Sequence, residues 1–230
     1  MPDTTCHRLG PIWLAPGITR INAITFLYGD SAVIGFLIFI NIGQAYVLNE
    51  NLGIPRSEQG TITGDLAFWS EITVLLIVAG FGLISDRIGR RVVFAFGLAM
   101  IGLAYLLYPI AHSIGELTAY RVIYAVGVAA ATVMLSVVVH DYPQEISRGK
   151  LVALSGIMGG LGSLTVMGVF GRLPAFFTNN GADAISAGQY TLWLASAICM
   201  LSAGLMLLGL KGGTPATIEQ RPSIDRKSVV

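Results

Sequence analysis

The sequence GLISDRIGRR, residues 82–91, separates two long apolar segments. ITVLLIVAGF precedes it, and VVFAFGLAMIGLAYLLYPIA follows it. This arrangement predicts two membrane-spanning helices joined by a short loop, because a span needs about 20 mostly apolar residues. Within six residues the loop gathers four charges, namely Asp86, Arg87, Arg90 and Arg91. Anchoring explains the arginines, but it does not explain Asp86, Gly82 or Gly89, so we expect the loop to have a further role.

The composition of the chain is that of a membrane protein. Of its 230 residues 54% are hydrophobic and only 12% are charged, whereas soluble domains carry about 25% charged residues. The mean hydropathy of +0.72 also favours a polytopic membrane protein. The net charge of +1, without a basic stripe, gives no indication of a nucleic-acid partner. Two cysteines provide neither a disulfide framework nor a metal site, and we expect no cofactor.

Six stretches are long enough to cross a bilayer, at about residues 21–48, 57–84, 92–111, 114–139, 151–173 and 189–210. They lack the alternation of barrel strands, so we predict an all-α membrane protein with six transmembrane helices. Ser57 is the expected N-cap of the second helix. Residues 1–20 form an N-terminal arm without a cleaved signal peptide, and the polar residues 211–230 form a tail or linker.

The lysines and arginines predict the orientation. If the N-terminus is cytoplasmic, eleven of the 14 basic residues lie on the inner side or in the two terminal segments. The other three are Arg56, Arg121 and Arg172. This bias follows the positive-inside rule. We therefore expect a multi-pass protein of the plasma (inner) membrane with both termini in the cytoplasm.

Small residues recur at helical spacing in the fourth and fifth segments. YAVGVAAATVML places Gly127 and Ala131 four apart, and SGIMGGLGSLTVMG does the same with Ser155, Gly159 and Ser163. Gly156 and Gly160 lie alongside. Such spacing lets helix backbones approach closely in lipid, so it predicts tightly packed helix pairs, and sliding surfaces during a conformational change are the alternative use.

The charged loop resembles a known signature. Residues 82–91 are similar to the loop between the second and third helices of the major facilitator superfamily, Gly-x-Leu-(Ser/Ala/Asp)-Asp-(Arg/Lys)-x-Gly-Arg-(Arg/Lys), with Ile84 as the one departure. Residues 121–129, RVIYAVGVA, resemble the family pattern R-x-x-Q-G-x-G-x-A, with Tyr124 and Ala125 in place of Gln and Gly. Residues 141–149, DYPQEISRG, resemble the sugar-porter loop E-x-x-P-x-x-x-R-G with one extra residue. The antiporter proline of the fifth helix is absent.

The resemblance covers about residues 20–210 and implies the amino-terminal half of a transporter that works by alternating access. It implies that Asp86 caps a helix of the other half and that Arg90 pairs with an acid after the fourth helix, either Asp141 or Glu145. Together with Gly82, Arg87, Gly89, Arg91 and Arg148, these residues would form a lock at the inner gate. The second half would be another copy of this chain or a separate chain, arranged about an axis along the membrane normal.

Three ionisable side chains fall near the middle of the predicted spans, namely Asp30, Glu71 and Arg121. Such groups are costly in a bilayer and are functional candidates by default. We expect Arg121 to pair with one acid, and we hypothesise proton coupling through Asp30 and Arg121, with Glu71 as the alternative acid. A static buried salt bridge is the structural alternative. Trp69 and Tyr124 are candidates for contact with the solute, with interfacial anchoring as their other interpretation.

The expected function is secondary transport of a small polar or organic solute, driven by an ion gradient, since no phosphate-binding loop is present. Protons are the expected coupling ion, and the bilayer, the solute and the second half are the expected partners. An intramembrane protease is disfavoured, because His140, Ser155 and Ser163 form no nucleophile–base pair at one depth. A truncated half that transports nothing, or a membrane assembly protein, is the alternative function.

Overall fold

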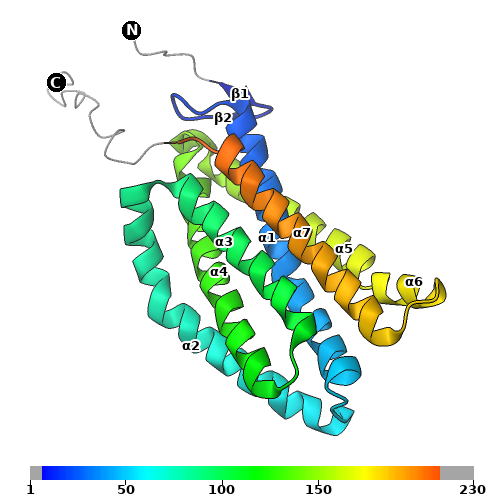
Figure 1. The fold of residues 1–230 in the computed structure, drawn as a ribbon. Helices are drawn as coiled ribbons and strands as arrows, with labels where there is room; N and C mark the ends of the chain where they lie inside the picture. Colours follow the sequence, from blue (N-terminus) through cyan, green and yellow to red (C-terminus); the bar gives the residue numbers. More distant parts are fainter. Residues whose placement is uncertain (1–6, 213–230) are drawn as a thin grey trace, which may run out of the picture.

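The computed structural model describes residues 7–212 and contains six helices that are long and apolar enough to cross a membrane (Figure 1). The predicted all-helical fold with six spans is therefore confirmed. The long helices are α1 (Arg20–Tyr46), α2 (Arg56–Ile88), α3 (Arg90–Leu107), α4 (Ile114–Asp141), α5 (Arg148–Phe170) and α7 (Ala184–Gly209). Most of the expected tail, and the first six residues, lie outside the described part of the chain.

Shorter elements connect the spans. Strands β1 (Arg8–Leu9) and β2 (Ile12–Trp13) form an antiparallel hairpin before α1. The short helix α6 (Leu173–Asn179) lies between α5 and α7, at the end of the bundle opposite the hairpin (Figure 1). Single turns of other helix types complete the set, a π turn at Val47–Asn51 and 3₁₀ turns at Tyr108–Ile110 and Glu145–Ser147.

Three of the long helices begin with a side-chain N-cap. Thr19 forms a capping box with Asn22 at α1, and the Ser113 and Asp183 side chains accept backbone N–H groups at α4 and α7. The hydrogen bonds from Ser186 hold the pKa of the exposed Asp183 carboxyl below its ordinary value. The predicted cap at Ser57 is wrong: α2 already begins at Arg56, and Pro55 precedes it with a proline φ of −56° and an extended ψ of 141°.

The helices form a bundle in which α1 packs between α5 and α7, and α3 packs between α4 and α7. Helix α2 packs mainly on α4 and lies at the edge of the bundle (Figure 1). The largest buried side chains come from α1 and α3 and include Phe26, Phe36, Phe39, Phe94 and Tyr105. By contrast, α2 buries only Leu66, Ser70 and Ser85 among its described residues. Most of its surface therefore has no neighbour in this bundle.

Glycines set the closest helix approaches. A Cβ on Gly97 of α3 would lie 2.7 Å from the Ala131 nitrogen, and one on Gly127 of α4 would lie 2.7 Å from the Gly97 carbonyl oxygen. The predicted close packing of the fourth helix is thus confirmed. In α5 it is Gly159 and Gly162 that face α1. The predicted companions in that helix, Gly156 and Gly160, have nothing within 4 Å of such a Cβ.

The N-terminal segment is docked against the loop after α4. The Ala15 amide donates to the Tyr142 carbonyl, and the Gln144 amide donates to the Trp13 carbonyl. Leu14 is fully buried beneath this contact. At the same end of the bundle, Lys211 donates its backbone N–H to the Tyr142 hydroxyl at 3.1 Å. The segments on either side of the spans therefore meet at Tyr142.

Candidate functional site

The first candidate site is a cleft of about 440 Å³ at the end of the bundle that carries the hairpin. The end of α2, the start of α3 and the end of α4 form its walls. Its lining residues are Gly82, Ser85, Asp86, Arg90, Ser136, Val137, His140 and Asp141. The signature loop thus faces the end of the fourth span, which is where the resemblance placed the gate.

The central contact of the cleft is an ion pair between Arg90 and Asp141. The Arg90 and Asp141 side chains are 22% and 41% exposed, so the pair is partly shielded from water. Asp86 is exposed and lies near enough to act electrostatically on the Arg90 guanidinium. Of the two acids that the sequence left open as partners, Asp141 is the one in contact. Glu145 is exposed in the following 3₁₀ turn and makes no ion pair within residues 7–212.

The other loop residues have distinct positions. Gly89 joins α2 to α3 with a φ of +96°, a conformation that favours glycine and allows the sharp turn. Gly82 lines the cleft but has open space where a Cβ would lie, so no close approach explains it. Arg87 and Arg148 are exposed, and the Arg91 guanidinium lies beside Gly212.

Asp30 is buried between α1 and α5, with 5% of its surface exposed. Ser155 is near enough for a side-chain hydrogen bond, and Gly159 leaves room for the carboxyl. Its Oδ2 atom is buried without a hydrogen-bond partner among the described residues. A buried carboxyl with one unsatisfied oxygen is costly when charged. The described residues therefore offset little of the cost of a charge at this position.

Arg121 belongs to a separate polar group near the other end of the bundle. Its guanidinium stacks on the Tyr124 ring at 5.1 Å from the centroid and is in reach of the Tyr108 hydroxyl. Tyr108 donates to the Gln44 side chain at 3.3 Å, and Gln44 donates to Thr63 at 3.1 Å. Neither Tyr108 nor Thr63 was predicted. A tyrosine at a helix end is typical of an interfacial anchor, so Tyr108 drew no attention.

The three candidate coupling residues form no ion pair with one another among the described residues, although Arg121 and Glu71 both act electrostatically on Tyr124. Tyr124, one turn from Arg121, donates to the Leu37 carbonyl, seven residues beyond Asp30 and about 10 Å further along α1. Within residues 7–212 no ion pair joins Arg121 to Asp30 or Glu71. The expected pairing is therefore not formed in this structure, and the buried Nε and Nη1 atoms of Arg121 have no hydrogen-bond partner among the described residues.

The remaining candidates differ in exposure. Glu71 and Trp69 are both exposed on α2, Trp69 by 51%. Two residues apart on a helix, they point in nearly opposite directions, and Glu71 lies near enough to Tyr124 of α4 to act on it electrostatically. Tyr124 is 3% exposed and is held by its hydrogen bond to α1, so it faces the interior of the bundle. Across the described residues no cluster of three His, Cys, Asp or Glu side chains is placed to hold a metal ion.

Tyr142 joins the cleft to the docked segments. Its ring packs on Phe26 at 5.9 Å, and its hydroxyl accepts the Lys211 amide. Burial raises the pKa of the Tyr142 hydroxyl to about 12, although the Lys211 amide and the Arg90 cation act in the opposite direction. The neutral hydroxyl is therefore the form that the fold favours.

We expect Tyr142→Phe to remove a loss of stability at high pH. The pKa is about 12 in the fold against 10.0 ordinarily, so stabilisation of about 3 kcal/mol is complete below pH 10 and is lost as the pH rises to 12. Thermal denaturation of the purified protein across this range measures the effect. The variant should lose less stability over the range than the wild type, while the exposed Tyr190→Phe control should match the wild type. Equal slopes for both variants would contradict the assignment.

A known family matches most of the chain. The family model described as Major Facilitator Superfamily matches residues 23–229. The chain belongs to the major facilitator superfamily. It is thus a multi-pass membrane protein of a family of transporters. No solved structure matches it significantly.

Curated relatives of this superfamily member are distant. The magnetosome protein MamZ of Paramagnetospirillum magneticum is 31% identical over 162 residues, which cover 66% of this chain and 23% of that protein. The magnetosome protein MamH of the same organism is 27% identical, with 61% and 34% covered. Myo-inositol transporter 1 of Cryptococcus neoformans var. grubii is 23% identical, with 94% and 38% covered. The chain therefore spans between about a quarter and two fifths of the length of these relatives.

Proposed function

We propose that this chain is one half of a secondary transporter that moves a small polar or organic solute by alternating access. Membership of the superfamily supports transport as the general activity. The observation that carries the mechanism is the ion pair between Arg90 and Asp141. It ties the start of α3 to the end of α4 beside the signature loop, so it can hold that side closed and release it by separating.

Protons are the proposed coupling ion, and Asp30 is the proposed carrier. Its carboxyl is buried against α5 with an oxygen that no described residue satisfies. Protonation removes the cost of holding a charge there. If α5 moves away from α1, water reaches the carboxyl and the proton can leave. Coupling then needs no contact with Arg121, whose buried guanidinium is left as a candidate for binding a polar group of the solute.

A second six-helix half is the proposed partner. Helix α2 buries few side chains and leaves Glu71 and Trp69 exposed. The spanning part of α5 is only 17% buried. A carboxylate on such a face is costly against lipid but acceptable beside a solvated pathway. A second half packed here would cover both helices and enclose the route for the solute.

The gate is tested by Asp141→Asn, which leaves Arg90 without its partner. We expect this side of the bundle to open more often, because the ion pair no longer favours the closed state. A cysteine placed at the exposed Ser136 of the cleft should then react several times faster with a membrane-impermeant maleimide. The native cysteines are replaced beforehand, and the labelling rate is read by mass spectrometry.

Two variants make this test specific. Glu145→Gln removes the neighbouring acid that is not paired with Arg90, and it should leave the labelling rate unchanged. Asp141→Glu preserves the charge and should restore most of the protection. The gate proposal fails if Glu145→Gln raises the rate as much as Asp141→Asn does, or if neither changes it.

A further inference from the structure

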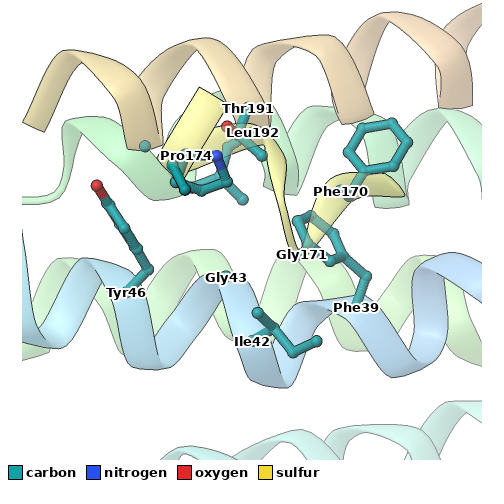
Figure 2. Close-up of a pocket in the computed structure, with 11 residues that line it drawn as sticks. Phe39, Ile42, Gly43, Tyr46, Phe170, Gly171, Pro174, Thr191 and Leu192 are labelled. Carbon is teal, nitrogen blue, oxygen red and sulfur yellow. The ribbon is translucent and has the colours of Figure 1, made fainter. Parts of the chain in front are cut away.

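A second cavity lies at the end of the bundle opposite the hairpin, between α1, the α5–α6 junction and the start of α7 (Figure 2). Its volume is about 230 Å³, which exceeds the 150 Å³ or so that holds a benzene molecule in a protein interior. Figure 2 shows Phe39 and Tyr46 on the α1 side, Phe170 and Pro174 at the α5–α6 junction, and Leu192 on α7.

The polar groups of this cavity are already satisfied. The Tyr46 hydroxyl donates to the Ala184 carbonyl at 2.7 Å, and the Thr191 hydroxyl donates to the Ala187 carbonyl at 2.8 Å. The other lining side chains are apolar or absent, as in Gly43 and Gly188. Both hydroxyl protons are used within the protein, so the lining offers a solute no free donor and few polar contacts, and the cavity favours an apolar occupant.

The cavity opens on an exposed apolar surface. Ile42 at its edge is 36% exposed, and Val169 and Phe176 beside it are 52% and 60% exposed. Phe177, Tyr190 and the indole of Trp193 form a chain of ring contacts next to α6. Aromatic side chains of this kind collect at the level of the lipid headgroups. The occupant available at this depth is therefore an acyl chain that descends from the headgroup layer.

A cation lies where the headgroup of such a lipid would be. Arg172 sits between the lining residues Gly171 and Pro174 and is exposed. It donates to the Gly168 carbonyl at 3.4 Å and makes no ion pair within the described chain. An arginine at this level extends its guanidinium toward phosphate groups while its stem stays in the apolar layer.

We propose that this cavity binds one phospholipid, with an acyl chain between α1 and α7 and the phosphate on Arg172. Figure 2 shows the space that the chain would occupy between Tyr46, Pro174 and Leu192. The bound chain would fill the gap under α6 and connect α5 to α7, which both pack on α1 and on α6. This inference is independent of whether the bundle transports a solute.

The test is native mass spectrometry of the purified full chain released from nanodiscs of phosphatidylethanolamine and phosphatidylglycerol in equal parts. The wild type should retain one phospholipid through detergent washing. Ala175→Trp, which fills the cavity from an exposed position on α6, should lower this retention about tenfold or more, because the acyl chain loses its buried surface. Arg172→Gln should lower it about threefold, as expected for one exposed charge contact.

Matched controls lie at the same end of the bundle. Thr178→Trp places the same bulk on an exposed part of α6 that does not line the cavity, and Arg56→Gln removes an exposed cation at the start of α2. Both should retain the lipid as the wild type does. Equal retention in Ala175→Trp and the wild type would overturn the proposal.

A second measurement uses the wild type alone, so it does not depend on the folding of a variant. A phospholipid with a photoactivatable diazirine near the end of its acyl chain should label peptides that contain residues 39–46 and 170–175. Labelling spread evenly over the exposed faces of α2, α5 and α7, without enrichment in these peptides, would also overturn the proposal.

Discussion

Asp30→Asn abolishes proton-driven uptake and leaves solute counterflow intact, if Asp30 carries the proton. Asparagine has nearly the same shape and can occupy the same place against Ser155 and Gly159. It cannot bind or release a proton, so the bundle loses its coupling and keeps its solute pathway. Net uptake driven by a proton gradient should fall to the level of empty liposomes. Exchange of labelled for unlabelled solute, which needs no net proton movement, should continue.

The measurement uses proteoliposomes and a panel of polyols, sugars and organic acids to find a solute that the wild type accumulates. Asp65→Asn is the matched control, because Asp65 is an exposed acid on α2 and should leave uptake unchanged. Proton-driven accumulation that survives in Asp30→Asn would exclude Asp30 as the carrier. Loss of counterflow together with uptake would assign Asp30 a structural role.

Gly97→Val should destabilise the bundle strongly. The added side chain would meet backbone atoms of α4, with its Cβ 2.7 Å from the Ala131 nitrogen and 2.9 Å from the Gly127 oxygen. Backbone cannot move aside as a flexible side chain can, so we expect the upper end of the overpacking range, about 3 kcal/mol or more. For a protein of this length that corresponds to a decrease in Tm of about 6–12 °C.

Gly204→Val is the matched control for this effect. Gly204 lies inside α7 and has nothing within 4 Å of the place where a Cβ would lie, so the same change in helix propensity occurs there without a clash. Tm is followed by the fraction of protein that stays monodisperse after heating. Similar shifts for the two variants would mean that α3 and α4 can separate at little cost and that their close approach is not important for stability.

Much of this fold can be predicted from sequence because the bilayer restricts the choices. Backbone groups in lipid must satisfy one another within a helix, so hydropathy alone locates the six spans. Gly89 in the charged loop indicated the tight turn, which its positive φ confirms. Helix α6 was missed because it has only seven residues and no apolar period of its own.

The contacts between segments distant in the sequence could not be predicted in the same way. The hairpin docks through backbone hydrogen bonds such as that from Ala15 to Tyr142, and these leave no side-chain pattern. The choice of Asp141 over Glu145 depends on the 3₁₀ turn that directs the second acid away. Arg121 and Asp30 were both placed near mid-membrane by counting residues, but their neighbours on α1 differ in depth by about two turns.

For the candidate site too, the sequence predicts the local features but not the contacts with other parts of the molecule. The signature loop indicated the end of the bundle at which a charged cleft forms, because its residues are contiguous and their spacing is specific to the family. The role of each charge depends on the second half and on motion between states, neither of which a local pattern encodes. Glu71 and Trp69 illustrate this, since both are exposed on α2 and their roles depend on what covers that helix.

The most direct test of the transporter-half assignment is the mass of the protein extracted from its own membrane, measured by native mass spectrometry. The exposed faces of α2 and α5 predict a particle that contains two six-helix bundles, as two copies, as this chain with another, or on one longer polypeptide. A particle of one 24.4 kDa chain alone, stable after mild extraction, would contradict the assignment. It would leave half a pathway and favour a protein that transports nothing.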